Sequence, residues 1–207
     1  MKKVLAIFTL CSSIVYGQVL EANDVVIELN FGFPNMRPLV IDPSGVSHSI
    51  FDFGENNSQS FGQFIIKGEF FMADKLGIVG SVNYGYFKTY DESQQDIYNG
   101  TTAQWTTSNY YYTTKVHKFR IAAGINFHFL RTERLDTYFG VLAGTKKAFG
   151  TYETNDPNAA GNITVITFPF ALRTQFGIRY FITEYLAANL EFGLGGPLIS
   201  FGAMYKF

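Results

Sequence analysis

The last ten residues, "LISFGAMYKF" at positions 198–207, decide the fold that the sequence predicts. In an extended chain, Ile199, Phe201, Ala203, Tyr205 and Phe207 fall on one side, and smaller or polar residues fall on the other. Chain termini usually fray into water unless another part of the protein holds them. A terminal strand that ends on an aromatic residue therefore needs a neighbouring strand.

The same alternation of apolar and polar residues recurs along the chain. In "VIELNFGF" at 26–33, Ile27, Leu29 and Phe31 alternate with Glu28 and Asn30. Further alternating segments lie within 61–72, 76–87, 118–130, 137–146, 166–181, 185–195 and 199–207. The sequence thus predicts eight strands, each with one apolar and one polar face.

In the segment 137–146 the alternation does not decide which side is apolar, because glycines occupy much of one side. Either Phe139, Val141 and Ala143 or Tyr138 and Leu142 form that face, and we expect the first set to point outward.

The connections between these strands alternate in length. Residues 34–60, 89–113 and 147–163 are expected to be long loops, and 73–76, 131–136 and 182–185 short turns. A fourth connection, at 195–197, is tight. An even number of strands with this alternation predicts an all-β fold, an eight-stranded antiparallel up-and-down transmembrane β-barrel. A secreted soluble barrel or sandwich is the alternative, but its outer face would be crowded with charged residues rather than with Phe, Ile, Leu and Val.

The first residues, "MKKVLAIFTLCSSIVYGQ", predict a secretory signal peptide at 1–17, followed by a barrel domain at 18–207. Cys11 is the only cysteine and lies inside this signal, without the small residue that precedes a lipidated cysteine, so we expect no thiol or disulfide in the mature chain. Without Lys2 and Lys3 the 16 basic residues fall to 14 against 17 acidic ones, a net charge of −3. Such a balance argues against a nucleic-acid partner.

Together, the C-terminal stretch, the signal and the strand pattern resemble the small OmpA/OmpX-type eight-stranded barrel family, without a periplasmic OmpA-like domain after the barrel. The resemblance implies a place in the outer membrane of a Gram-negative bacterium, with membrane lipid and lipopolysaccharide as neighbours. It also implies that Phe201, Tyr205 and Phe207 form the assembly signal that the barrel-assembly machinery reads.

The polar face of the strands is expected to line the barrel interior, which side chains fill in a barrel of eight strands. Its charged members are Glu28, Lys67, Glu69, Arg120, Arg173, Arg179 and Glu191. Buried charges are costly without partners, so we predict a salt-bridge network, with Glu191 and Arg173 on adjacent strands as a pair. This network is expected to be a polar plug that fixes the fold. The alternative is a narrow, gated channel for ions or water.

The aromatic residues of the segment 89–113 include Trp105 and the triplet Tyr110, Tyr111 and Tyr112. Tyr and Trp are enriched where surfaces bind partners, so one hypothesis is a structural or surface-interaction role with an extracellular or envelope protein. The other interpretation is that the strands simply continue as a ribbon rich in Tyr and Thr.

Few residue patterns in the sequence are typical of catalysis or metal binding, so we expect no enzymatic activity, no cofactor and no metal site. His48, with Ser47, Ser49 and Asp52, offers a base, a nucleophile and an orienting carboxylate, which makes a lipid-modifying enzyme the least favoured alternative. The loop carboxylates show no EF-hand spacing. His128 is expected to point inward near the periplasmic end.

Overall fold

The computed structural model describes residues 20–33, 39–41, 58–99, 104–157, 164–166 and 169–207. These residues form ten strands: β1 (Val25–Phe33), β2 (Leu39–Ile41), β3 (Ser58–Ala73), β4 (Leu76–Asn99), β5 (Gln104–Arg131), β6 (Leu135–Thr154), β7 (Thr164–Ile166), β8 (Phe170–Phe181), β9 (Leu186–Leu194) and β10 (Ile199–Lys206). Within them, no helix is long and apolar enough to cross a membrane.

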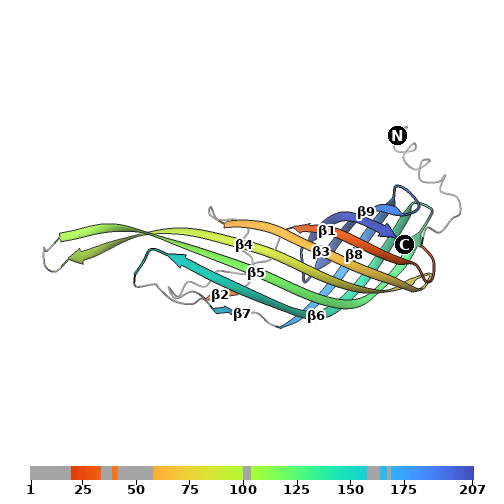
Figure 1. The fold of residues 1–207 in the computed structure, drawn as a ribbon, viewed down its shortest axis with the longest axis horizontal. Coiled ribbons are helices and arrows are strands. Elements are labelled where there is room, and N and C mark those ends of the chain that lie inside the picture. The colour runs from red at the N-terminus through yellow and green to blue at the C-terminus, as the bar shows by residue number, and fades with distance from the viewer. Residues whose placement is uncertain (1–19, 34–38, 42–57, 100–103, 158–163, 167–168) are drawn as a thin grey trace, which may run out of the picture.

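Eight of the strands close into a barrel in the order β1-β10-β9-β8-β6-β5-β4-β3, while β2 and β7 pair in a separate sheet (Figure 1). Every neighbouring pair in the barrel is antiparallel. The last strand closes the ring, since β10 pairs with β1 from Val26↔Lys206 to Phe33↔Ile199. The backbone N–H of Phe207 also donates to the carbonyl of Val25 at 2.9 Å. The predicted eight-stranded up-and-down barrel is confirmed.

The two ends of the barrel differ, and we name them the turn end and the ribbon end. The turn end carries the short β3–β4, β5–β6 and β8–β9 connections and the C-terminus (Figure 1). These connections fall within the predicted short turns at 73–76, 131–136 and 182–185. The ribbon end carries the tight β9–β10 connection at residues 195–198 and the extension of β4 and β5.

The prediction of long loops at 89–113 and 147–163 is wrong for most of their residues. β4 and β5 stay paired as far as Asn99↔Gln104, and β6 remains a strand up to Thr154. The alternative interpretation, a continuing ribbon, is confirmed. Its physical cause is that Thr and Tyr favour extended chain and that pairing satisfies the backbone hydrogen-bonding groups outside the bilayer. Of the predicted loop 34–60, residues 34–38 and 42–57 lie outside the described residues.

We call residues 90–99 of β4 and 104–113 of β5 the β4–β5 ribbon, because β3 pairs with β4 no further than Ser58↔Thr89. The ribbon projects well beyond the barrel (Figure 1). The 28 residues of β5 make a strand about 95 Å long, whereas about ten residues of a tilted strand suffice to cross a bilayer.

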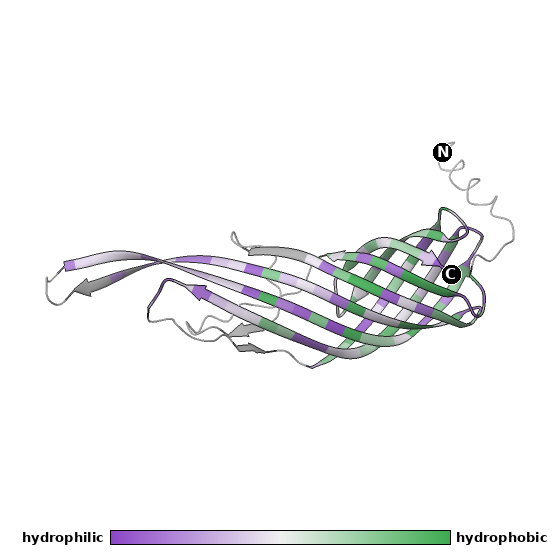
Figure 2. Cartoon of the chain, viewed as in Figure 1, coloured by the Kyte–Doolittle hydropathy of each residue, from purple (hydrophilic) through white to green (hydrophobic). Residues whose placement is uncertain are grey.

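Hydrophobic and hydrophilic residues alternate along the strands of the barrel (Figure 2), and the exposed side chains are mostly apolar while the buried ones are mostly polar. Leu29, Ile121 and Leu172 are 60%, 60% and 64% exposed, and such residues alternate with buried ones along every strand of the ring. In β6, Phe139 and Val141 point outward while Tyr138 and Leu142 are fully buried, which confirms the expected orientation. A continuous apolar belt on a closed sheet is the surface that hydrocarbon requires.

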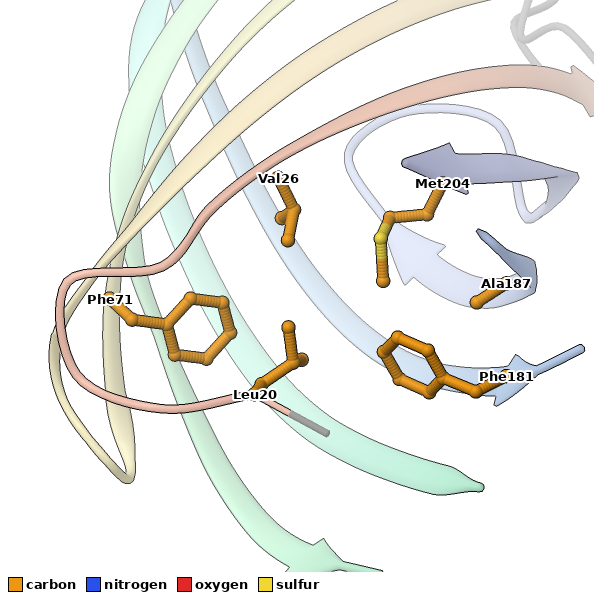
Figure 3. Packing of buried hydrophobic residues seen from close by; sticks show 6 residues of the cluster. All are labelled: Leu20, Val26, Phe71, Phe181, Ala187 and Met204. Atoms are coloured by element: carbon orange, nitrogen blue, oxygen red, sulfur yellow. The ribbon is translucent and has the colours of Figure 1, made fainter. Parts of the chain in front are cut away.

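An apolar cluster closes the lumen at the turn end (Figure 3). We call it the apolar plug, and its members are Leu20, Val26, Phe71, Phe181, Ala187 and Met204. Leu20 lies before β1 and is 1% exposed, so the segment that precedes the first strand contributes to the seal.

Residue 177 must be a glycine because the ring of Tyr138 lies too close to it for a side chain. This contact gives the first testable prediction. Gly177 pairs with Tyr138 across β8 and β6, and a Cβ at this glycine would overlap the tyrosine ring. Because Tyr138 is fully buried and cannot move aside, Gly177→Ala should lower the free energy of unfolding by about 1–3 kcal/mol. Gly80→Ala is the matched control: its Cβ would have no atom within 4 Å, so its effect should stay within about 0.5 kcal/mol. Urea unfolding in lipid vesicles measures both, and equal effects would contradict the packing.

Candidate functional site

The candidate site is the lumen of the barrel. All seven charged side chains predicted for the interior face it, and their exposed fractions run from 0% for Glu191 to 5% for Arg120. They come from β1, β3, β5, β8 and β9, and the alternation of each strand places them inside. They do not form one ion-pair network, because Arg120 pairs with no carboxylate among the described residues.

Arg179 is the centre of the cluster nearest the apolar plug. Its Nε donates to Glu28 Oε1 at 2.8 Å, and its Nη1 donates to Asp136 Oδ2 at 3.1 Å. Its Nη2 donates to both Glu28 and Glu69. The guanidinium also lies over the ring of Tyr138, 4.3 Å from the centroid. One cation thus holds three buried carboxylates, the arrangement for which the forked guanidinium is suited.

His128 completes this group, which we call the Arg179 cluster: Arg179, Glu28, Glu69, Asp136 and His128. The Nδ1 of His128 lies 2.8 Å from Asp136 Oδ1, and its Nε2 lies 3.0 Å from Glu69 Oε1. Both ring nitrogens face carboxylate oxygens, so both can donate only when the imidazole carries two protons. The cluster then opposes two cations to three anions.

A second group, the Glu191 cluster, consists of Glu191, Lys67, Tyr138, Ser200 and Arg173. Lys67 and Tyr138 both donate to Glu191 Oε1, and the Ser200 hydroxyl donates to Oε2 at 3.1 Å. Arg173 Nη2 also reaches Oε2, at 3.4 Å. The predicted pair of Glu191 and Arg173 is therefore present, but Lys67 is the nearer cation.

Neutral side chains, whose part in the network was not predicted from the sequence, connect the two clusters. Gln175 accepts from Lys67 at 3.0 Å and donates to Asn126 at 3.1 Å, and Asn126 in turn donates to Glu69 at 2.9 Å. Asn189 donates to Glu28 at 2.9 Å. The signal that would have found them is the alternation itself, since each stands on the polar face of its strand. Asp136 was assigned to a turn, but it is the second residue of β6.

The aromatic residues predicted as interaction candidates have different environments. Trp105 and Tyr111 are 71% and 41% exposed, but Tyr110 is only 9% exposed. Tyr110 therefore presents almost no surface to a partner, contrary to the expectation. Tyr112 donates its hydroxyl to Asp156 at 3.0 Å and stacks on Tyr152, which ties β5 to the end of β6.

Hydrogen bonding also fixes the base of the β4–β5 ribbon. The Tyr90 hydroxyl donates to Glu92 at 2.7 Å, and this bond raises the pKa of Tyr90 because ionisation would place two anions side by side. Lys115 and Glu153 form an ion pair at 2.6 Å.

The catalytic candidates His48, Ser47, Ser49 and Asp52 lie outside the described residues. Within the described ranges, no three His, Cys, Asp or Glu side chains are grouped so that they could hold a metal ion.

Phe201, Tyr205 and Phe207 all face outward on or next to β10, with exposed fractions of 55%, 48% and 67%. Tyr205 contacts both Phe207 and Tyr185, at ring-centroid distances of 5.0 and 6.4 Å. Tyr185, Tyr205 and Phe207 thus form an aromatic patch at the turn end of the apolar belt, whereas Phe201 lies nearer the other end of β10, against Phe31.

A closed ring of eight antiparallel strands, apolar outside and charged inside, defines the class of small transmembrane β-barrels. Solved structures agree at the level of the fold. The outer membrane protein OprG from Pseudomonas aeruginosa matches with a TM-score of 0.52 and 14% identity, covering 90% of this chain and 97% of that one. The resemblance to small outer-membrane barrels inferred from the sequence is thus confirmed for the fold.

Two further structures of this kind match with lower TM-scores. The N-terminal β-barrel domain of Pseudomonas aeruginosa OprF is 12% identical and has a TM-score of 0.45, covering 91% of this chain and 100% of that one. Ail, the attachment invasion locus protein of Yersinia pestis, is 12% identical and has a TM-score of 0.40, with the same coverage of 91% and 100%. No protein-family model and no curated protein sequence matches the chain.

Proposed function

We propose that the protein is an integral barrel of the bacterial outer membrane, exported by its signal peptide, with a structural or surface-interaction role carried by the β4–β5 ribbon. Its neighbours in this proposal are outer-membrane lipid and lipopolysaccharide. Phe201, Tyr205 and Phe207 serve as the signal to the barrel-assembly machinery, and an extracellular or envelope protein is the ribbon's partner.

One observation carries the proposal: the ribbon continues far beyond the barrel while its outer edges lack a third strand among the described residues. β3 pairs no further than Thr89, and β6 pairs with β5 no further than Tyr112. Beyond these positions, no third strand pairs with β4 or β5 among the described residues, and Asn155 covers only the start of the β5 edge, where it hydrogen-bonds the backbone of Tyr111 and Asn109. Such edges accept a strand from another chain, and the exposed Trp105 side chain lies beside them.

The burial of charged side chains in the lumen supports a polar plug rather than a channel. Glu191 and Tyr138 have no exposed surface, and Arg179 is 1% exposed, so the two clusters exclude water from the middle of the barrel. The apolar plug adds a second seal at the turn end. The narrow channel stays as the alternative, since rings of charged side chains line many ion pores. A lipid-modifying enzyme has no support among the described residues.

The second testable prediction is that the ribbon and the barrel are separable. Removing residues 93–110 and joining Glu92 to Tyr111 through Asn-Gly leaves the pair Glu92↔Tyr111 as the end of a two-residue hairpin. We expect the shortened protein to fold, with heat-modifiable gel migration like that of the full chain. Cells that display it should lose the surface partners that can be cross-linked to the full-length protein.

Point variants sharpen this test. Trp105→Ala should reduce cross-linking without shortening the ribbon, while Thr106→Ala, its exposed neighbour, should not. Equal cross-linking by all these variants would argue against the ribbon as the interaction element. Conductance steps in planar bilayers that persist in the shortened protein would favour the channel instead.

A further inference from the structure

Among the described residues, positive and negative side chains that face the lumen are unevenly distributed between its two ends. Between the turn end and Arg173, the lumen contains four carboxylates: Glu28, Glu69, Asp136 and Glu191. They form ion pairs with Arg179, Lys67 and Arg173, and two of them also contact His128. Nearer the ribbon end the inward-facing charged residues of β5 and β6 are Lys118, Arg120 and Lys146. Within the described residues, no carboxylate pairs with Arg120 or Lys146.

Arg120 is the critical member of this group. It is 5% exposed, and its Nε and Nη1 atoms have no hydrogen-bond partner among the residues that the structure describes. It stands directly opposite Lys146 across β5 and β6, so a like charge occupies the position where a partner would be expected. A buried guanidinium without an acceptor is destabilising, and like charges nearby add to that effect.

Arg173 reaches the same place from β8. Its Nη1 donates to the carbonyl of Pro197 at 3.2 Å, and its Nε and Nη2 turn toward Gln175 and Glu191. The β9–β10 connection bends inward here, since Gly196 and Pro197 are both buried. A Cβ added to Gly196 would overlap Arg173 Nη1 and lie 2.8 Å from Arg120 Nη1. The glycine therefore faces both guanidinium groups.

We propose that Arg120, Arg173 and Lys146, beneath Gly196, form a binding site for a small oxyanion of the phosphate or sulfate type at the ribbon end of the lumen. Such an anion accepts several hydrogen bonds from forked guanidinium donors and neutralises the surplus of positive charge. It supplies the acceptors that the Nε and Nη1 atoms of Arg120 lack. The site is independent of the proposed role of the ribbon.

Unfolding of the refolded full-length barrel tests the site, with inorganic phosphate as the probe and chloride at the same ionic strength as the reference. We expect phosphate to raise the unfolding midpoint in urea more than chloride does, with a saturable dependence on concentration. Arg120→Gln should weaken the apparent affinity for phosphate by about tenfold or more. Lys75→Gln, which removes one positive charge from the turn end, should leave it unchanged.

Two further measurements keep the test decisive if a variant alters folding. Without phosphate, Arg120→Gln should be at least as stable as the wild type, because it removes an unpaired buried charge. Gly196→Ala keeps every charge but fills the space beside both guanidinium groups, and it should weaken phosphate binding while the barrel still shows heat-modifiable migration.

Three results would overturn the proposal. The first is a phosphate effect no larger than that of chloride, and the second is equal phosphate binding by Arg120→Gln and the wild type. The third is a marked loss of stability in Arg120→Gln without phosphate, since it would mean that a group of the protein itself neutralises Arg120.

Discussion

Removing residues 199–207 should abolish the folded barrel. These residues contain the whole of β10, which pairs with β1 on one side and with β9 on the other. Without it, two strand edges would face lipid, where each unsatisfied backbone group costs several kcal/mol. The sum exceeds the stability of any domain of this size. We expect no compact, heat-modifiable species when the shortened chain is refolded into detergent or vesicles.

Deletion of Phe207 alone is the matched control. This residue contributes one backbone hydrogen bond to Val25 and a ring contact with Tyr205, and its side chain is 67% exposed. The loss should be at most about 3 kcal/mol, so the chain should still fold in vitro. Fractionation of cells then tests delivery to the outer membrane separately, because an assembly signal would be lost while the fold remains. A compact species from the chain without residues 199–207 would contradict closure by β10.

Replacing Arg179 by methionine should be the most destabilising single substitution in the lumen. The variant keeps most of the side-chain length but leaves Glu28, Glu69 and Asp136 without their shared cation. Breaking a buried ion pair by removal of one partner typically costs about 3–5 kcal/mol, and here three carboxylates lose the same partner. Urea unfolding in lipid vesicles measures the change.

Arg173→Met is the comparison for Arg179→Met. Glu191 keeps Lys67, Tyr138 and Ser200 as donors when Arg173 is removed, so the loss should be clearly smaller. Equal losses in the two variants would mean that Lys67 does not neutralise Glu191. A stability of Arg179→Met equal to that of the wild type would rule out the Arg179 cluster as described.

The alternation of apolar and polar residues along the chain was enough to predict the barrel. A strand has a side-chain period of two, so the sequence alone shows which residues share a face, and a closed sheet turns one whole face inward. For this reason the strand number, the short turns and the inward position of residues such as Glu28 and Arg179 could be predicted. The ribbon was harder, because segments rich in Tyr, Thr and Asn occur both in loops and in exposed strands, and only the pairing of β4 with β5 distinguishes them.

Apart from the pair Glu191–Arg173, which the sequence predicted from adjacent strands, the tertiary structure decided which charged residues pair inside the lumen. Arg179 and Glu28 are 151 residues apart in the chain, and Lys67 and Glu191 are 124 apart. Which cation meets which carboxylate depends on the register and stagger of eight strands, which no local pattern encodes. The sequence by itself thus determined an eight-stranded barrel with a charged interior. Only the closed ring decided that Arg179 holds three carboxylates, that Lys67 is nearer than Arg173 to Glu191, and that Arg120 lies buried beside other cations.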